Sequence, residues 1–462
     1  MSARGFRSRL ERSETGLRET LATNRSHLSN AASMLGTTTV TSLLGAGFWW
    51  LAARGFSQDD VGLATASVSA MTLLGFLATF GLGTLLMGEL PQRKEGRRSL
   101  INAALASVFA IGALFGLLFT ILAPLVSDAF EPVAANAVTI GVFILGVGLT
   151  GLVFVLDEAL IGLLRGGLQL SRNTMFASVK FVALIPVMAL VSDAGPGWIY
   201  GAWVVGIAIS FVVMVRFFRE RIEADPLRPN FVLLRKMRGS ALSHFAFNLA
   251  LEAANLSLPI LIVGLISPRA NASFYVAWMI AGHLVVVPGS LGTVLYPIGS
   301  DDRGSMSRGL LLTVKVSVVI GIVANLLLLP LAEPVLGIFG AGYAQMGTTP
   351  LHIMALAVFP LTVKALYVAV HRVERTLRVG LPFVWGGAIL ELGAATIGAL
   401  VDGLTGVAVA WLGAAIVQAV VMAPSVLRAY REPVPGDDHD SLSADELDAL
   451  DGLAVPTKQI PG

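Results

Sequence analysis

Twelve apolar segments follow one another along this chain, and the basic residues gather in every second gap between them. Each segment has at least 20 residues, enough for a helix to cross a bilayer core of about 30 Å. All but five of the 32 lysines and arginines lie in the N-terminal arm, the alternate gaps or the C-terminal tail. Since basic loops stay in the cytoplasm, the pattern predicts a multi-pass plasma-membrane protein with both termini cytoplasmic. The segments are 30–54, 61–87, 100–125, 134–156, 173–192, 198–218, 240–266, 273–299, 308–332, 350–371, 381–401 and 404–427.

Composition and gap length argue against a soluble enzyme. Hydrophobic residues make up 55% of the chain and charged residues 13%, about half the charged share of a soluble domain. No gap in the membrane region is long enough for a catalytic domain, and neither a P-loop nor an HExxH motif occurs. The chain has no cysteine, which excludes disulfides and thiolate metal sites. We therefore expect no enzyme activity, no metal and no cofactor, and a basic surface that meets membrane lipids rather than nucleic acid.

The chain divides into two membrane lobes with polar segments around them. The longest internal gap separates six apolar segments from the next six, and the acidic C-terminal tail has the composition of a disordered segment. The predicted fold is all-α, with twelve transmembrane helices in two six-helix lobes. The predicted regions are a cytoplasmic arm (1–28), the N-lobe (29–218), a cytoplasmic linker (219–239), the C-lobe (240–428) and a cytoplasmic tail (429–462).

Two short motifs recur in the second half of the chain. Ser57-Gln-Asp-Asp-Val-Gly62 matches Ser267-Pro-Arg-Ala-Asn-Ala272, and Gly81-Leu-Gly-Thr84 matches Ser290-Leu-Gly-Thr293, both at a spacing of about 210 residues. A repeat with an even number of spans inserts both copies in the same orientation. The lobes are then related by a pseudo-two-fold axis along the membrane normal, with a site expected between them.

The N-terminal half also carries a family resemblance. The stretch 53–62, the segment Gly81–Thr84 and the segment Leu156-Asp-Glu-Ala-Leu-Ile-Gly-Leu-Leu-Arg165 resemble polysaccharide-biosynthesis flippases. These belong to the multidrug/oligosaccharidyl-lipid/polysaccharide exporter superfamily. The resemblance implies two helix bundles that form a V around a cavity lined mainly by spans one, two, seven and eight. It also implies that a polyprenyl-diphosphate-linked sugar moves from the inner to the outer leaflet.

The seventh span carries the main candidate site. His244, Asn248, Glu252 and Asn255 recur with helical spacing and share one helix face. A carboxylate near mid-membrane is costly, so Glu252 is expected to face a wet cavity and bind substrate hydroxyls or a coupling Na⁺ or H⁺. The alternative is a polar seam between two helices.

Other charges inside the membrane segments are secondary candidates. Lys180, Lys315 and Lys364 each lie about seven residues from the predicted cytoplasmic end of a segment, a common depth suited to capture of a diphosphate head group. The alternative for each is a side chain that reaches back to the interface. Arg54 is a candidate phosphate contact or an interfacial anchor, while Arg165 and Arg172 could instead pair with acids such as Asp157 and Glu158.

Glu391 and His283 lie near mid-depth, and each is either a protonation switch or a structural hydrogen-bonding group. A third pattern, Gly146-Val-Gly-Leu-Thr-Gly151, fits GxGxxG but lies inside the fourth span without a preceding strand. We interpret it as a helix-packing surface rather than a nucleotide loop.

These features lead to one principal functional hypothesis. The chain is expected to flip a polyprenyl-diphosphate-linked oligosaccharide by alternating access, for surface polysaccharide or glycan assembly. Its expected partners are that lipid, membrane lipids and proteins such as a glycan polymerase or glycosyltransferase. The alternative is a cation- or proton-coupled exporter of drugs or small amphiphiles with the same fold. A membrane-embedded glycan polymerase is disfavoured because the outer gaps are short, and an inert scaffold would make Glu252→Gln silent.

Overall fold

A computed structural model of the protein describes residues 40–431 except 94, 192–194, 220–227, 232–233, 235–240, 302 and 375. Side chains are also left out at 217–219, 241–244, 287–301 and 303–308. The predicted arm, most of the linker and the tail beyond 431 lie outside the described residues.

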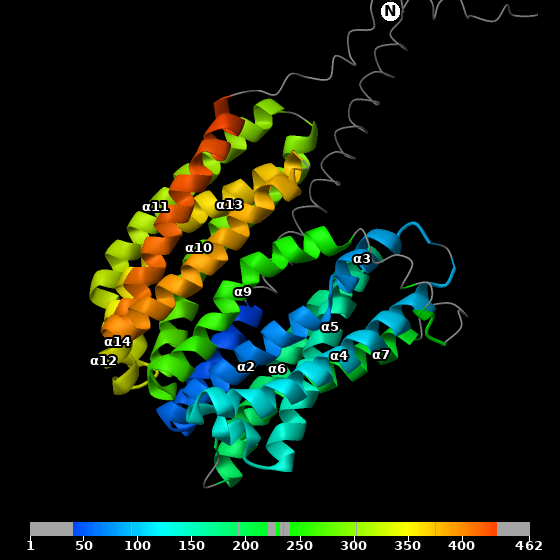
Figure 1. The fold of residues 1–462 in the computed structure, drawn as a ribbon, viewed down its shortest axis with the longest axis vertical. Helices are drawn as coiled ribbons and strands as arrows, with labels where there is room; N and C mark the ends of the chain where they lie inside the picture. Colours follow the sequence, from blue (N-terminus) through cyan, green and yellow to red (C-terminus); the bar gives the residue numbers. More distant parts are fainter. Residues whose placement is uncertain are drawn as a thin grey trace, which may run out of the picture.

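The N-lobe is built from helices that run up and down the same bundle (Figure 1). Its first described helix covers residues 40–55, the visible part of the first predicted span. The remaining elements are α2 (Gln58–Ala78), α3 (Leu82–Glu89), α4 (Arg97–Val126), the short η1 (Asp128–Ala134), α5 (Ala137–Gly162), α6 (Gly166–Leu190) and α7 (Pro196–Arg219).

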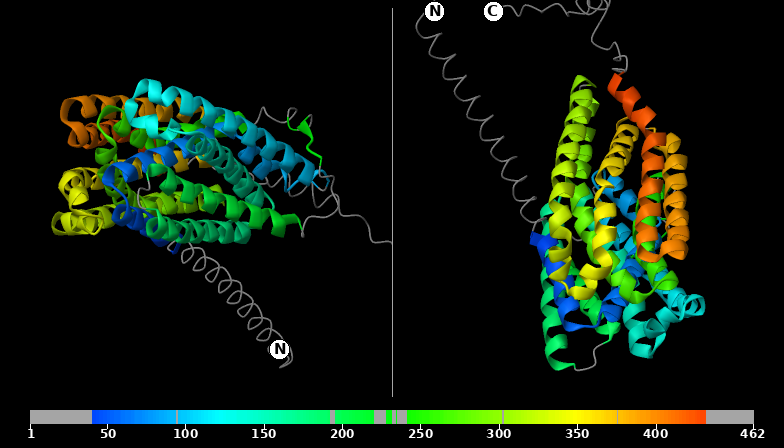
Figure 2. Two further views of the ribbon diagram at one scale, coloured as in Figure 1. Left: turned by 90° about the horizontal axis from the view of Figure 1, so that it is seen from below. Right: turned by 90° about the vertical axis from the view of Figure 1, so that its left-hand side faces the viewer.

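The C-lobe repeats this arrangement on the other side of the molecule. Figure 1 shows α10 to α14 gathered on one side, α2 to α7 on the other and α9 between them, and Figure 2 shows the two groups from other directions. The structure contains no β-strand in the part of the chain that it describes. The C-lobe helices are α9 (Ala241–Leu265), α10 (Pro268–Asp301), α11 (Arg303–Gly337), α12 (Ala341–Ala355), α13 (Val358–Val373) and α14 (Leu377–Arg431).

The twelve predicted spans do not correspond one to one with continuous helices, because α12 and α13 together form one span and α14 forms two. Within the described ranges, eight helices alone are long and apolar enough to cross a membrane, and a ninth span forms if α12 and α13, bent by 48°, are counted together. The helix α14 is two arms, because Asp402 and Gly403 leave helical geometry. The arms fold back on each other: a side chain at Gly398 would meet the Gly406 carbonyl oxygen at 2.1 Å. With α10 and the helix at 40–55, this gives the twelve predicted spans.

The second predicted span, 61–87, is broken. Phe80 has a φ of 43° and Gly81 a φ of 76°, so the chain turns through left-handed geometry between α2 and α3. Glycine takes that conformation at little cost, whereas a phenylalanine is strained there. The break ends α2 and starts α3 on a new axis beside α5 and α9.

The GxGxxG segment is a packing surface, as predicted. A side chain at Gly146 would meet Met71 of α2 at 2.6 Å, and one at Gly148 would meet Phe109 of α4 at 2.8 Å. At Gly151 the nearest atoms belong to Val108 and to the Gly75 carbonyl. Small residues therefore let α2, α4 and α5 approach closely, as is common between membrane helices.

The lobes meet tightly at one end of the bundle, where α2 and α10 begin. A side chain at Gly62 would lie 1.7 Å from the Pro268 carbonyl oxygen, so the two backbones are in direct contact. The buried Asn271 donates to the Gly62 carbonyl oxygen at 2.7 Å and to Thr65 Oγ1 at 2.9 Å. We call this end, with its α2–α10 contacts, the closed end.

A second polar contact at the closed end again joins the lobes. Gln58 Nε2 donates to Ser273 Oγ at 2.8 Å and to the Arg269 carbonyl oxygen at 3.2 Å. The first predicted repeat pair is visible here, since Ser57 accepts from the Asp60 amide and Ser267 from the Ala270 amide, both at 3.1 Å. The two serines therefore cap α2 and α10 in the same way.

The outer helices present apolar side chains to the surroundings. Only 17% of the most apolar part of α6 and 22% of that of α11 is buried, against 72% for α2. An outward face of leucine and valine is expected where lipid takes the place of water. The structure therefore describes a multi-span membrane protein with α2 at its centre and α6 and α11 at its rim.

Candidate functional site

A cavity of about 880 Å³ lies between the lobes, toward the end opposite the closed end. We call this the open end. The N-lobe wall comes from α3 and α5, and the C-lobe wall from α9, α13 and the start of α14. The lining residues are Thr84, Met87, Glu158, Ile161, Phe247, Asn248, Leu251, Glu252, Asn255, Val285, Leu361, Lys364, Ala365, Val368, Ala369, Arg372 and Leu377.

The polar stripe of α9 lies along this cavity. Asn248, Glu252 and Asn255 all line it, and Glu252 is exposed within it. Asn255 donates to the Leu251 carbonyl oxygen of its own helix at 3.3 Å, which leaves the amide oxygen available. His244 begins the stripe in the sequence, but its side chain lies outside the description. The structure therefore places three of the four stripe residues together, while their binding role stays a prediction.

The opposite part of the C-lobe wall is α13, and it is basic. Lys364 lines the cavity and donates to Glu391 Oε1 of α14 at 2.8 Å. Glu391 is 1% exposed and lies behind the lysine rather than in the wall. Toward the open end, Arg372 Nη2 donates to Asn248 Oδ1 at 3.3 Å, which links α13 to α9. The cavity wall therefore contains two cationic side chains at different levels, Arg372 toward the open end and Lys364 deeper, where the buried Glu391 carboxylate holds it.

The described part of the wall includes span ten as well as spans from the expected set. Spans one, two, seven and eight were expected to form most of the lining. Among the described side chains, span seven (α9) and the end of span two (α3) do so, but span ten (α13) contributes more than span eight, whose only lining residue is Val285.

Three polar lining residues were missing from the predicted site, namely Thr84, Glu158 and Arg372. Glu158 of α5 and Thr84 of α3 lie in the N-lobe wall of the cavity, and Arg372 of α13 lies in the C-lobe wall. Glu158 also borders a much smaller space beside the break between α2 and α3, where a side chain at Gly83 would meet its carboxylate at 2.7 Å. The sequence did draw attention to Glu158, since an acid within a membrane span needs a partner. We interpreted it as one half of an ion pair with a nearby arginine rather than as a cavity residue.

The three lysines lie at different distances from the ends of their helices. The helices extend beyond the apolar segments, so Lys180 lies 14 residues into α6, about 21 Å along its axis. Lys180 is 4% exposed and Lys315 is exposed on the lipid-facing side of α11, whereas Lys364 is in the cavity wall. Neither Lys180 nor Lys315 lines the cavity, so these two do not form a head-group site with Lys364.

Arg54 and His283 also lie outside the cavity wall. Arg54 is exposed at the last turn of the helix at 40–55, toward the closed end. The His283 ring, also exposed, lies with Nδ1 2.6 Å from the Met279 carbonyl oxygen of its own helix. That contact corresponds to the hydrogen-bonding alternative for His283 rather than to a group in the cavity.

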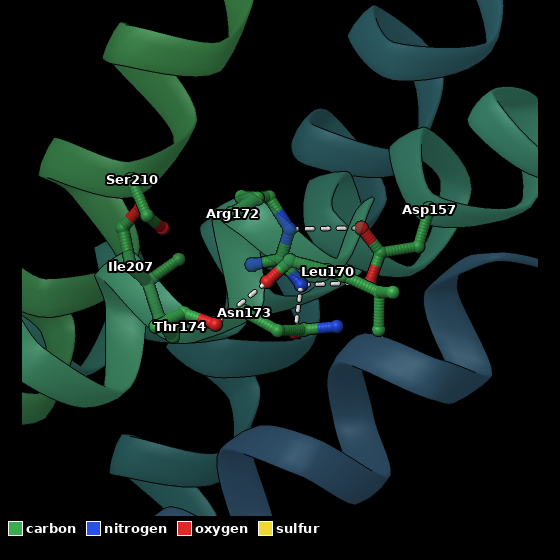
Figure 3. Close-up of polar contacts among 7 residues, drawn as sticks. All are labelled: Asp157, Leu170, Arg172, Asn173, Thr174, Ile207 and Ser210. Carbon is green, nitrogen blue, oxygen red and sulfur yellow. Dashed lines mark hydrogen bonds and ion pairs between the residues drawn. The ribbon is translucent and has the colours of Figure 1, made fainter. Parts of the chain in front are cut away.

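A buried ion pair fixes the junction of α5 and α6 (Figure 3). Arg172 Nε and Nη2 donate to the two carboxylate oxygens of Asp157 at 2.8 and 2.7 Å, and Nη2 also donates to Asn173 Oδ1 at 2.6 Å. Arg172 is 2% exposed. The pairing predicted for Arg172 is confirmed, and it leaves Asp157 committed while Glu158 faces the cavity. No group of three or more potential metal ligands occurs among the described side chains.

Comparison with known proteins adds information about the fold. No protein-family model and no curated protein matches the sequence. Among solved structures, the inward-facing conformation of a multidrug resistance MATE family transporter of the MOP superfamily aligns with a TM-score of 0.64 and 15% identity, over 84% of this chain and 94% of that one. This chain has the MATE transporter fold.

Two further structures give the same result. The MATE multidrug transporter DinF-BH, solved in complex with a ligand, aligns with a TM-score of 0.61 and 15% identity, over 85% of this chain and 94% of that one. An outward-facing conformation of a MATE family transporter aligns less well, with a TM-score of 0.56 and 13% identity over 85% and 93% of the two chains. At these identities the likeness concerns the fold alone. It does not distinguish polysaccharide flippases from drug transporters.

Proposed function

We propose that this protein is an alternating-access transporter that flips a polyprenyl-diphosphate-linked oligosaccharide. The observation that carries the proposal is a cavity between two lobes that is open at one end and sealed at the other by α2 and α10. Two lobes that share one cavity can expose it to either side in turn. The proposal includes no enzymatic step.

The open end is proposed to face the cytoplasm. The gaps that contain Arg93, Arg97, Arg165 and Arg372 all lie at this end, because α3, α5 and α13 end there and α4 begins there. Basic loops are retained on the cytoplasmic side, in the plasma membrane as in other bilayers. A substrate made on the cytoplasmic face would then enter the cavity in the state that the structure represents.

The charges of the α13 wall support an anionic head group. Lys364 and Arg372 present an ammonium and a guanidinium to the cavity, and both donate strong hydrogen bonds to phosphate oxygens. Asn248 and Asn255 offer amide groups of the kind that bind sugar hydroxyls. A volume of about 880 Å³ lies within the range of small-molecule sites, so the cavity would take the head group while the prenyl chain stays in lipid.

A second function is supported by different observations. Glu158 and Glu252 place two acids in the same cavity, which suits an organic cation or a coupled Na⁺ or H⁺. The similar solved structures include a multidrug transporter in complex with a ligand. A cation- or proton-coupled exporter of drugs or small amphiphiles is therefore the alternative.

Reconstitution in liposomes separates the two functions. The protein is incorporated into vesicles with a fluorescent polyprenyl-diphosphate sugar, and access of an external reagent to inner-leaflet label is followed with and without an ion gradient. Flippase activity predicts faster access than in protein-free vesicles. No acceleration, together with gradient-driven uptake of an organic cation in parallel vesicles, would replace the proposal with the alternative.

A further inference from the structure

Lys180 occupies an unusual place for a charged side chain. It lies in the middle of α6, is 4% exposed and does not line the cavity between the lobes. The helix packs against α7, and Gly206 of α7 leaves room for the lysine, because a side chain there would meet Lys180 Cβ at 2.9 Å. An ionisable group so deep in a membrane protein requires a role or a partner.

The surroundings of the amine are aromatic. Lys180 Nζ lies 3.5 Å from the centroid of the Trp203 ring, 4.5 Å from that of Phe176 and 5.3 Å from that of Phe48. The three rings come from α7, α6 and the helix at 40–55, so the cage closes around the end of the side chain. We call Phe48, Phe176 and Trp203 the ring cage.

No carboxylate reaches the amine from the described parts of the packed helices. The acids of α5 are Asp157, which is committed to Arg172, and Glu158, which faces the cavity between the lobes. Arg172 precedes Lys180 by eight residues, roughly 12 Å along the helix.

The other described titratable side chains of these helices are either hydrogen-bonded elsewhere or exposed. On α7, the Tyr200 hydroxyl donates to the Thr139 carbonyl oxygen at 3.4 Å, while Arg216 is exposed near the open end and Arg219 follows it. On the helix at 40–55, the ionisable residue is the exposed Arg54.

Two opposing effects act on this amine. Burial without a counter-ion favours the neutral form, since a charged group loses its hydration. Ring faces favour the ammonium, and a cation over tryptophan is stabilised by about 0.5–2 kcal/mol. Because the two effects oppose each other, the amine has a favourable contact in its charged form and a favourable burial in its neutral form.

We propose that Lys180 and its ring cage form a proton-binding site inside the N-lobe. The lone pair of Nζ accepts a proton to give the ammonium, and the same proton leaves to restore the neutral amine, so no other reactant is needed. The inference deepens the proposed function by naming H⁺ as a coupled ion, and its spectroscopic test does not depend on the transported substrate.

The cage also connects the amine to the other lobe. Trp203 lies 5.9 Å from Trp49, and Trp49 lies 5.1 Å from Tyr275 of α10, measured between ring centroids. The charge state of Lys180 changes how strongly Trp203 is held over the amine, and Trp203 packs on the ring that contacts α10. Protonation is thereby linked to the helix that seals the closed end.

Tryptophan fluorescence tests the site directly. The chain has seven tryptophans, and one of them lies against the amine. A pH titration of the purified full-length protein from roughly pH 5 to 10 should show a sigmoidal change in emission. Lys180→Met should abolish that change, and Trp203→Phe should remove most of it. Lys180→Arg, which stays charged throughout, should hold the emission at its acidic value.

Lys315 supplies the matched control, since it is a membrane-embedded lysine exposed on α11 away from any ring cage. Lys315→Met should titrate like the unaltered protein. An unchanged titration in Lys180→Met and Lys180→Arg, or no titration in the unaltered protein, would overturn the proposal. If Lys180→Met fails to fold, Lys180→Arg and Trp203→Phe still decide the outcome. Loss of the titration in a protein that moves no lipid-linked sugar would leave the proton site intact and reject only the proposed substrate.

Discussion

Lys364 and Glu391 form an ion pair inside the C-lobe, and this pair holds the Lys364 ammonium group in the cavity wall. Glu391 is 1% exposed and its Oε1 accepts from Lys364 Nζ at 2.8 Å. Two charges taken from water are costly, and a close hydrogen-bonded pair offsets much of that cost. The carboxylate thus keeps the ammonium in place while one side of the lysine faces the cavity.

Removing one partner of this pair should destabilise the protein more than removing both. Lys364→Met leaves Glu391 buried without a partner, at a cost of roughly 3–5 kcal/mol. The double variant Lys364→Met/Glu391→Leu should recover most of this loss. Thermal unfolding of the purified variants measures the difference, and a double variant that unfolds below the single one would contradict the ion-pair account.

Glu252 should matter for transport and little for stability. Its side chain is exposed in the cavity, so Glu252→Gln should leave the unfolding temperature unchanged. Loss of a charge that binds a coupling ion or substrate should slow flipping about tenfold or more, equivalent to about 1.4 kcal/mol. Liposome flipping assays of Glu252→Gln and the lipid-facing control Lys315→Gln measure this. Equal rates in both variants would reject a coupling role.

At the residue scale, the sequence identified isolated charges but not their partners. Glu252 and Lys364 were found because any charge within an apolar segment needs a reason. The pairing of Lys364 with Glu391 could not be predicted, since the residues belong to different spans and the rotation of each helix is set by packing. The position of Lys180 was counted from the start of the apolar segment at 173. Because α6 begins seven residues earlier, at Gly166, the lysine lies farther along its helix than that count implied.

At the scale of the elements, close backbone contacts set the arrangement of α2 and α10. Gly62 has no side chain, so the Pro268 carbonyl oxygen can approach its backbone closely. A Cβ atom at position 62 would lie only 1.7 Å from that oxygen. The apolar segments predicted both helices, but they carried no information about this crossing point. The break at Phe80–Gly81 was equally hidden, because it lies within an apolar segment. The fold-back of α14 was predicted, because the gap between the last two predicted spans, 402–403, is where Asp402 and Gly403 leave helical geometry.

Gly62→Ala should therefore loosen the closed end. The added methyl group must push a backbone carbonyl aside, and forced overpacking costs about 1–3 kcal/mol. We expect a lower unfolding temperature and a shift toward states in which α2 and α10 separate. The control is Gly393→Ala, because a side chain there meets nothing within 4 Å. Comparable destabilisation by both substitutions would show that the α2–α10 contact is not special.

At the scale of the whole molecule, the fold follows from two lobes of like orientation. The alternation of basic gaps and the repeat at about 210 residues predicted this arrangement, and the common fold with MATE transporters confirms it. Which end is open could not be predicted, since both conformations are compatible with one sequence. The structure represents a state sealed by α2 and α10, and the alternating access that we propose requires that this seal open.

Reversible cross-linking of the closed end tests that requirement most directly. The chain has no cysteine, so Gln58→Cys/Ser273→Cys adds the only two thiols, at positions whose side chains are in contact across the lobes. A short, cleavable bifunctional thiol reagent is applied to the protein in liposomes, and flipping of labelled lipid is measured before and after cleavage. Alternating access predicts that the linked protein stops flipping and that cleavage restores the original rate. A linked protein that flips lipid at the full rate would contradict the account.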